Sequence, residues 1–125
     1  MKTIALNSRN LNNSLVFYRS LLDRMPDEIS PNLIRYETDQ FRLDIIESVK
    51  DAKGGRHILE VKERSELQEI SRRMSRFKKI ERLKEECENI GKAIGLTDPD
   101  GNKWVIGNPE EQVHFEKCYI DSEIF

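Results

Sequence analysis

The sequence predicts an α+β fold in which two βαβββ modules form a curved mixed sheet around a cup, with the helices outside. Three observations predict it. A strand, a helix and further strands follow one another twice, each time in about half of the 125 residues. Each predicted helix begins at an N-cap signal. Strong turn residues close the last hairpin. We place the first module at 1–53, the second at 54–109 and a C-terminal extension at 110–125.

The first module begins with residues 2–8, whose apolar residues alternate as in a strand. Residues 11–23 carry apolar side chains at three- and four-residue spacing, which predicts a helix, and Asn10 is its expected N-cap. Pro26 and Pro31 bracket a short return strand. Residues 32–39 and 41–48 are predicted as two strands joined by a tight turn at 39–40.

The second module repeats this order. Residues 56–62 predict a strand, and Ser65 with Gln68 predicts a capping box that opens a helix. Residues 78–84 are a weak strand candidate. Residues 92–97 and 103–107 predict a final hairpin around the turn Asp98-Pro99-Asp100-Gly101-Asn102. The extension 110–125 carries many apolar residues, so we expect it to pack on the domain or on a partner subunit.

Composition and charge exclude several classes of protein. Lys and Arg number 21 and Asp and Glu 23, a balance that does not indicate nucleic-acid binding. No apolar run is long enough to span a membrane, and no signal peptide is evident. Two cysteines, Cys87 and Cys118, are too few for a disulfide framework. We therefore expect a cytoplasmic protein with reduced thiols.

Three segments together resemble the vicinal oxygen chelate superfamily, which includes glyoxalases, bleomycin resistance proteins and dioxygenases. They are 11–22, with its Phe-Tyr pair; 54–61, which opens the second module; and 97–104, the last hairpin. The hairpin is most similar to cadmium-induced and carbon–arsenic lyase-like members. This resemblance implies the fold predicted above and a ligand cup between the modules.

The resemblance also implies where a divalent metal would bind. It places the four ligand positions of the family on Thr3, Asp44, His57 and Val105. An alkyl side chain has no lone pair to donate, and a neutral hydroxyl is a poor ligand, so only Asp44 and His57 remain credible. Catalytic sites normally keep three protein ligands. We therefore expect no cofactor, or at most a weakly bound divalent metal.

Four side chains are predicted to line the cup: Asn7, Arg42, Asp44 and His57. Asp44 has two interpretations, an ion pair with Arg42 on the sheet or a catalytic carboxylate facing His57. His57 is either a histidine at the edge of the core or a catalytic or ligand-binding group.

Two functions remain open from the sequence. The first is a protein that binds a small polar or anionic organic molecule without a tight metal. The second is a metal-dependent lyase, isomerase or dioxygenase, to which His114 of the extension could supply a further ligand. In both cases we expect a homodimer with no nucleic-acid or membrane partner.

Overall fold

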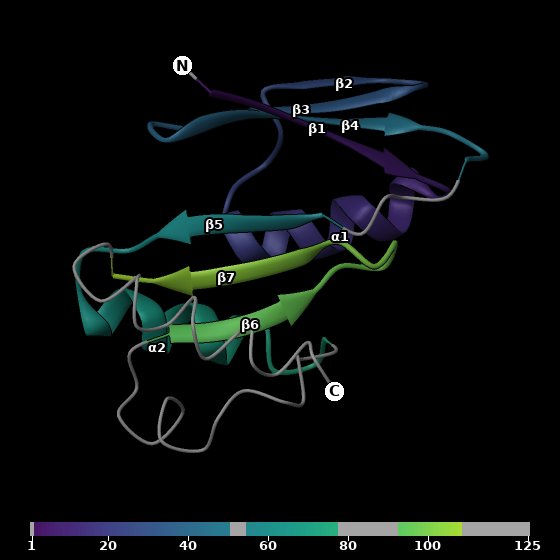
Figure 1. The fold of residues 1–125 in the computed structure, drawn as a ribbon. Coiled ribbons are helices and arrows are strands. Elements are labelled where there is room, and N and C mark those ends of the chain that lie inside the picture. The colour runs from purple at the N-terminus through teal and green to yellow at the C-terminus, as the bar shows by residue number, and fades with distance from the viewer. Residues whose placement is uncertain (1, 51–54, 78–92, 109–125) are drawn as a thin grey trace. The chain divides into compact units, whose positions relative to one another are not determined.

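The computed structural model describes residues 2–50, 55–77 and 93–108 (Figure 1). The first half contains β1 (Lys2–Ser8), α1 (Leu11–Leu22), β2 (Glu28–Ser30), β3 (Leu33–Glu37) and β4 (Phe41–Glu47). The second half contains β5 (Arg56–Glu60), α2 (Arg64–Arg73), β6 (Ala93–Thr97) and β7 (Lys103–Gly107). The strand predicted at 78–84 and the extension 110–125 lie outside the described residues.

The strands form two sheets of the same topology. The four-stranded sheet has the order β1-β4-β3-β2, with β1 parallel to β4 and the other pairs antiparallel. The three-stranded sheet has the order β5-β7-β6, with β5 parallel to β7 and β6 antiparallel to it. Strands β5, β6 and β7 therefore correspond to β1, β3 and β4. This correspondence confirms the repeat predicted from the sequence.

The described residues divide into two compact units. One comprises 2–50, residue 55 and the turn 98–102, and the other comprises 56–77, 93–97 and 103–108. The module boundary between residues 53 and 54 stays a prediction from the sequence. Although the turn joins β6 to β7, it belongs with the first unit.

Alternation along the strands gives the four-stranded sheet one buried face and one polar face. The buried face packs with Phe17, Tyr18 and Leu21 of α1, all nearly inaccessible to solvent. The residues of the sheet on this face are Ile4, Leu6, Ile34, Tyr36, Phe41, Leu43 and Ile45. Burying such aliphatic and aromatic groups contributes about 1.5–3 kcal/mol for each side chain. The opposite face is left for polar groups.

The two helices begin differently. Asn10 caps α1 as predicted, because its side-chain oxygen accepts a hydrogen bond from the Asn13 amide at 3.1 Å. The capping box predicted at Ser65 and Gln68 is wrong, since the N-cap position of α2 is Glu63, two residues before Ser65, and it has no side-chain cap. Glu66 instead accepts a hydrogen bond from the Lys62 amide at 3.3 Å.

The turn between β6 and β7 is organised around a buried carboxylate. Asp98 is only 5% exposed, and its Oδ1 accepts hydrogen bonds from the amides of Asp100 and Asn102 at 2.9 and 2.8 Å. Its Oδ2 accepts from the Tyr18 hydroxyl at 2.5 Å and from the Asn102 side-chain amide at 2.9 Å. Gly101 has a φ of 90°, a conformation that glycine adopts without strain.

A second carboxylate of the turn joins it to the start of α1. Asp100 accepts hydrogen bonds from the Arg9 amide at 3.0 Å and from the Ser14 hydroxyl at 3.2 Å. Ser14 is fully buried, and its hydroxyl lies 2.7 Å from that of Ser8. The turn predicted from Asp, Pro and Gly propensities thus also anchors the first helix.

We predict that Tyr18→Phe destabilises the protein more than Tyr36→Phe. Both rings are fully buried, so the matched pair compares only the two hydroxyl groups. Tyr18 donates to a buried carboxylate, whereas Tyr36 donates to the neutral Arg24 carbonyl at 3.2 Å. Hydrogen bonds to charged groups contribute about 1.5–3 kcal/mol, and neutral ones about 0.5–1.5 kcal/mol. Urea denaturation measures the free energy of unfolding of both variants. An equal or larger loss of stability in Tyr36→Phe would contradict the role given to Asp98.

Candidate functional site

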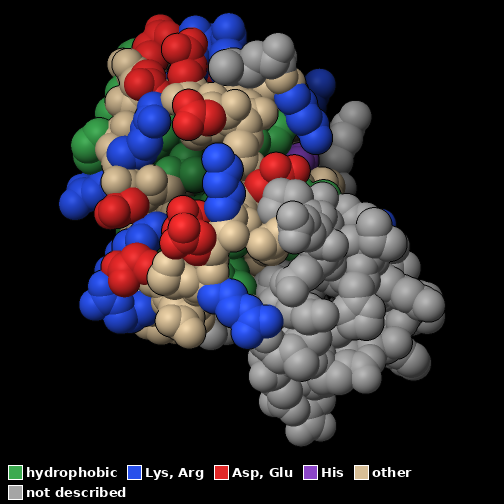
Figure 2. Space-filling model, turned by 90° about the vertical axis from the view of Figure 1, so that its left-hand side faces the viewer, with side chains coloured by type: hydrophobic (Ala, Val, Ile, Leu, Met, Phe, Trp, Pro, Cys, Tyr) green, Lys and Arg blue, Asp and Glu red, His purple; other side chains and the backbone are tan. Residues whose placement is uncertain are grey.

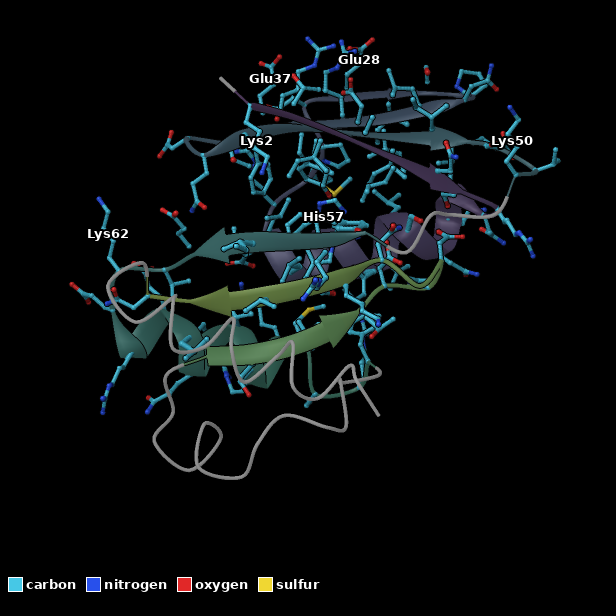
Figure 3. All side chains as sticks on the ribbon, in the orientation of Figure 1. Lys2, Glu28, Glu37, Lys50, His57 and Lys62 are labelled. Carbon is cyan, nitrogen blue, oxygen red and sulfur yellow. The ribbon has the colours of Figure 1, made fainter. Side chains whose placement is uncertain are left out.

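The candidate site is the polar face of the four-stranded sheet, the face opposite the core. The register of the strands arranges it in three rows that cross the sheet. The first row contains Thr3, Arg42 and Glu37; the second Ala5, Asp44, Arg35 and Glu28; the third Asn7, Ile46, Leu33 and Ser30. Glu28 and Glu37 project from the side of the sheet away from α1 (Figure 3). The predicted cup residues Asn7, Arg42 and Asp44 therefore share one face.

Asp44 lies at the centre of this face and is shared by two arginines. Its Oδ1 accepts from Arg35 Nε at 2.8 Å, and its Oδ2 accepts from Arg42 Nη2 at 3.2 Å. Arg35 also donates through Nη1 to Glu28 at 2.9 Å. The Arg42–Asp44 ion pair considered from the sequence is present, and Arg35 extends it across the neighbouring strands.

The pKa values follow from these contacts. The hydrogen bond from Arg35, with a further one from Arg42, lowers the pKa of Asp44 below its usual value, although burial opposes the shift. Reciprocally, Asp44 raises the pKa of Arg35. Asp44 is therefore an ionised carboxylate at neutral pH, and it is poorly suited to act as a general acid.

Arg35 was missed in the sequence, although a signal for it was present. A hairpin with its turn at Asp39-Gln40 pairs residue 35 with residue 44, and this is the register of β3 and β4. A charged residue opposite Asp44 on a neighbouring strand should therefore have been expected. The side chain of Arg35 is 24% exposed, so the guanidinium remains accessible from the polar face.

His57 lies at the edge of the core, which is one of the two environments considered for it from the sequence. It lies in the other compact unit, in register with Trp104, and the two rings are 5.2 Å apart at their centroids. It shares the face of β5 that carries Leu59, which is buried, and its own Nε2 atom is also buried. Trp104 is fully buried.

Ile4 and His57 each lie seven positions before the helix that follows their strand. Ile4 is a core residue, and by this count the equivalent of the exposed Thr3 is Arg56. A role of His57 in a ligand site stays a prediction. Neither unit by itself assembles Asn7, Arg42, Asp44 and His57.

The four positions that the family resemblance assigned to a metal are also distributed between the units. Thr3 lies beside Arg42 in the register of β1 and β4, while Val105 is a buried aliphatic residue in β7. Within the described part of the chain, no group of three or more His, Cys, Asp or Glu residues could hold a metal ion. His114 lies outside that part.

On the face shown in Figure 2, acidic and basic side chains of the described residues are interspersed. This pattern agrees with the balanced composition of the chain. Among the described residues, no helix is long and apolar enough to cross a membrane.

Comparison with solved structures establishes the fold. The chain is similar to a glyoxalase/bleomycin resistance protein from Catenulispora acidiphila, with a TM-score of 0.66 and 22% identity over 85% of this chain and 95% of that one. It is also similar to the bleomycin resistance determinant encoded on the transposon Tn5, with a TM-score of 0.65 and 18% identity over 88% and 98% of the two chains.

A lactoylglutathione lyase from Agrobacterium tumefaciens gives a TM-score of 0.64 and 18% identity over 88% of this chain and 93% of that one. Neither a protein-family model nor a curated protein matches the sequence. The chain therefore has the glyoxalase/bleomycin resistance fold of two βαβββ-like modules. The comparisons do not support the finer resemblance to cadmium-induced or carbon–arsenic lyase-like proteins.

We predict that Asp44→Asn destabilises the protein by about 1–2 kcal/mol near neutral pH, because two guanidinium groups lose their shared carboxylate. Glu37→Gln, an exposed change on the same face, is the matched control and should cost less than about 0.5 kcal/mol.

The effect of Asp44→Asn should also depend on pH. A lowered pKa in the folded state means that ionised Asp44 stabilises the protein above its unfolded pKa of about 3.9, and that this contribution is lost as the pH falls through the folded value. The difference between wild type and variant should therefore shrink from pH 6 toward pH 3. Urea unfolding measured across this range tests it, and a pH-independent difference would contradict the ion pairs.

Proposed function

We propose that this chain is a glyoxalase/bleomycin-resistance-like protein that binds a small polar or anionic organic molecule on its polar face, without a tight catalytic metal. The observation that carries the proposal is the sharing of Asp44 between Arg35 and Arg42. Two guanidinium groups have more N–H donors than one carboxylate can accept, so donors remain for a ligand. Charge-assisted hydrogen bonds from arginine suit a carboxylate, sulfonate or phosphate group.

The same arrangement argues against a divalent cation at Asp44. A metal ligand must present a free lone pair, but both carboxylate oxygens of Asp44 already accept hydrogen bonds from arginine. The two positive charges next to them would also repel a cation. Thr3, the neighbouring position of the resemblance, is in register with Arg42 and adds no anionic ligand.

Proteins that share the fold include a bleomycin resistance determinant and a lactoylglutathione lyase. The fold is therefore compatible with both binding and catalysis, and the residues of the site must decide between them. In this chain they favour binding. The homodimer and the cytoplasmic location remain predictions from the sequence, and the extension invoked for the dimer lies outside the described residues.

Thermal unfolding of chelator-treated protein tests the proposal. Small carboxylates and phosphonates are screened, and an effective ligand at about one hundred times its Kd should raise Tm by about 5–10 °C. Arg42→Ala should abolish this rise while lowering the Tm of the free protein only slightly. Arg24→Ala is a suitable control, since its side chain is similarly exposed, 42% against 38%, and lies outside the three rows.

Zinc, nickel and manganese ions at micromolar concentration should leave Tm unchanged in the same experiment. A large and reversible stabilisation by one of these metals, lost in Asp44→Asn, would contradict the proposal. It would favour the metal-dependent lyase, isomerase or dioxygenase instead. The absence of any stabilising organic anion would contradict it as well.

A further inference from the structure

The polar face contains an apolar region next to the arginines. Ile46 on β4 and Leu33 on β3 are directly paired across the strands, in the row next to Arg35 and Asp44. Ile46 is 41% exposed and Leu33 is partly exposed, although both lie on the face opposite the core. We call these two residues, together with the exposed Ala5 on β1, the apolar corner.

The apolar corner is not needed by the core of the unit. The core face is already formed by the opposite side chains of the same strands, such as Ile45 and Ile34. A solvated face of a sheet ordinarily carries polar side chains, and the other rows of this one do. Ile46 and Leu33 interrupt this pattern as a pair, in the row next to Arg35 and Asp44.

The distance between the two kinds of group sets the size of a ligand. Neighbouring rows are separated by two residues along each strand, or about 7 Å. A ligand whose anionic group is held by the guanidinium N–H donors of Arg35 or Arg42 would therefore place its apolar portion over the apolar corner. That portion would be an aromatic system of one or two rings or a branched aliphatic group of similar size.

From this juxtaposition we infer that the ligand is an amphiphilic organic anion, with a carboxylate or sulfonate head on the arginines and a flat apolar body over Ile46 and Leu33. The inference rests on the proposed function and narrows its ligand class. A wholly hydrophilic dianion would leave the apolar corner exposed to water. A neutral hydrocarbon would leave the guanidinium donors without a new acceptor.

The probe for this inference is 8-anilinonaphthalene-1-sulfonate, an aromatic sulfonate whose fluorescence reports transfer to an apolar site. Its neutral analogue N-phenyl-1-naphthylamine lacks the charged head, and succinate lacks the apolar body. We expect saturable binding of the sulfonate at one site per chain, with NMR amide shifts at Arg35, Asp44 and Ile46. Both control compounds should bind at least about tenfold more weakly, because N-phenyl-1-naphthylamine loses the charge-assisted hydrogen bonds and succinate loses the burial of the apolar rings.

Two variants and two matched control variants show where on the protein the sulfonate probe binds. Arg42→Gln should weaken binding of the sulfonate about tenfold, and Ile46→Thr about threefold, because the methyl groups lose their contact with the rings. Arg24→Gln and Val16→Thr should change it less than twofold. Val16 is an aliphatic residue of α1 with a similar exposure, 48% against 41% for Ile46.

The outcomes separate the inference from the proposed function. If succinate binds as tightly as the sulfonate and Ile46→Thr has no effect, the anion site stands and the amphiphilic inference is wrong. If the sulfonate binds but Val16→Thr weakens it more than Ile46→Thr does, the apolar corner is not its site, and the inference is again wrong. If neither anion shifts the amides of Arg35 and Asp44, both the inference and the proposed function fail.

Discussion

The carboxylate of Asp44, held between Arg35 and Arg42, is the interaction on which the interpretation of the site depends. It places two arginines and one carboxylate at the centre of a sheet face, with Glu28 paired to Arg35 beside them and the apolar corner in the next row. Such a cluster gains little stability where it is exposed, but removing one partner from its buried centre leaves charges without compensation. The same contacts keep Asp44 ionised, occupy its oxygens and hold the guanidinium groups of both arginines on one face of the sheet.

The fold supports this cluster because one face of the four-stranded sheet forms the core and the other face carries the site. Alternation sends most aliphatic side chains of β1, β3 and β4 toward α1, and the opposite face carries the charged rows together with the apolar corner. The turn at Asp98 stabilises the start of α1 through Tyr18, Arg9 and Ser14. A segment that is remote in the sequence therefore helps to hold the helix against the sheet that carries the site.

Local signals in the sequence were sufficient for most elements and for part of the site. The alternation of β4 placed Arg42 and Asp44 on one face, and Asn10 and the turn at 98–102 marked two element boundaries. The start of α2 was missed because Ser65 has an attractive capping pattern while the chain enters the helix at Glu63. The role of His57 stays a prediction, because this residue lies in a different compact unit from Asn7, Arg42 and Asp44. To predict that Arg35 contacts Asp44, one needs the register of the β3–β4 hairpin, which depends on pairing between strands.

The pKa of Asp44, measured by carboxyl carbon NMR in metal-free protein, tests the central claim most directly. The claim predicts a titration midpoint clearly below the ordinary aspartate value near 3.8, moving upward in Arg35→Gln, whose hydrogen bond is the largest cause of the shift. A midpoint at or above 3.8, unaffected by this substitution, would contradict it. Asp44 would then be free to act as an acid or as a metal ligand, and the case for an arginine-lined anion site would be lost.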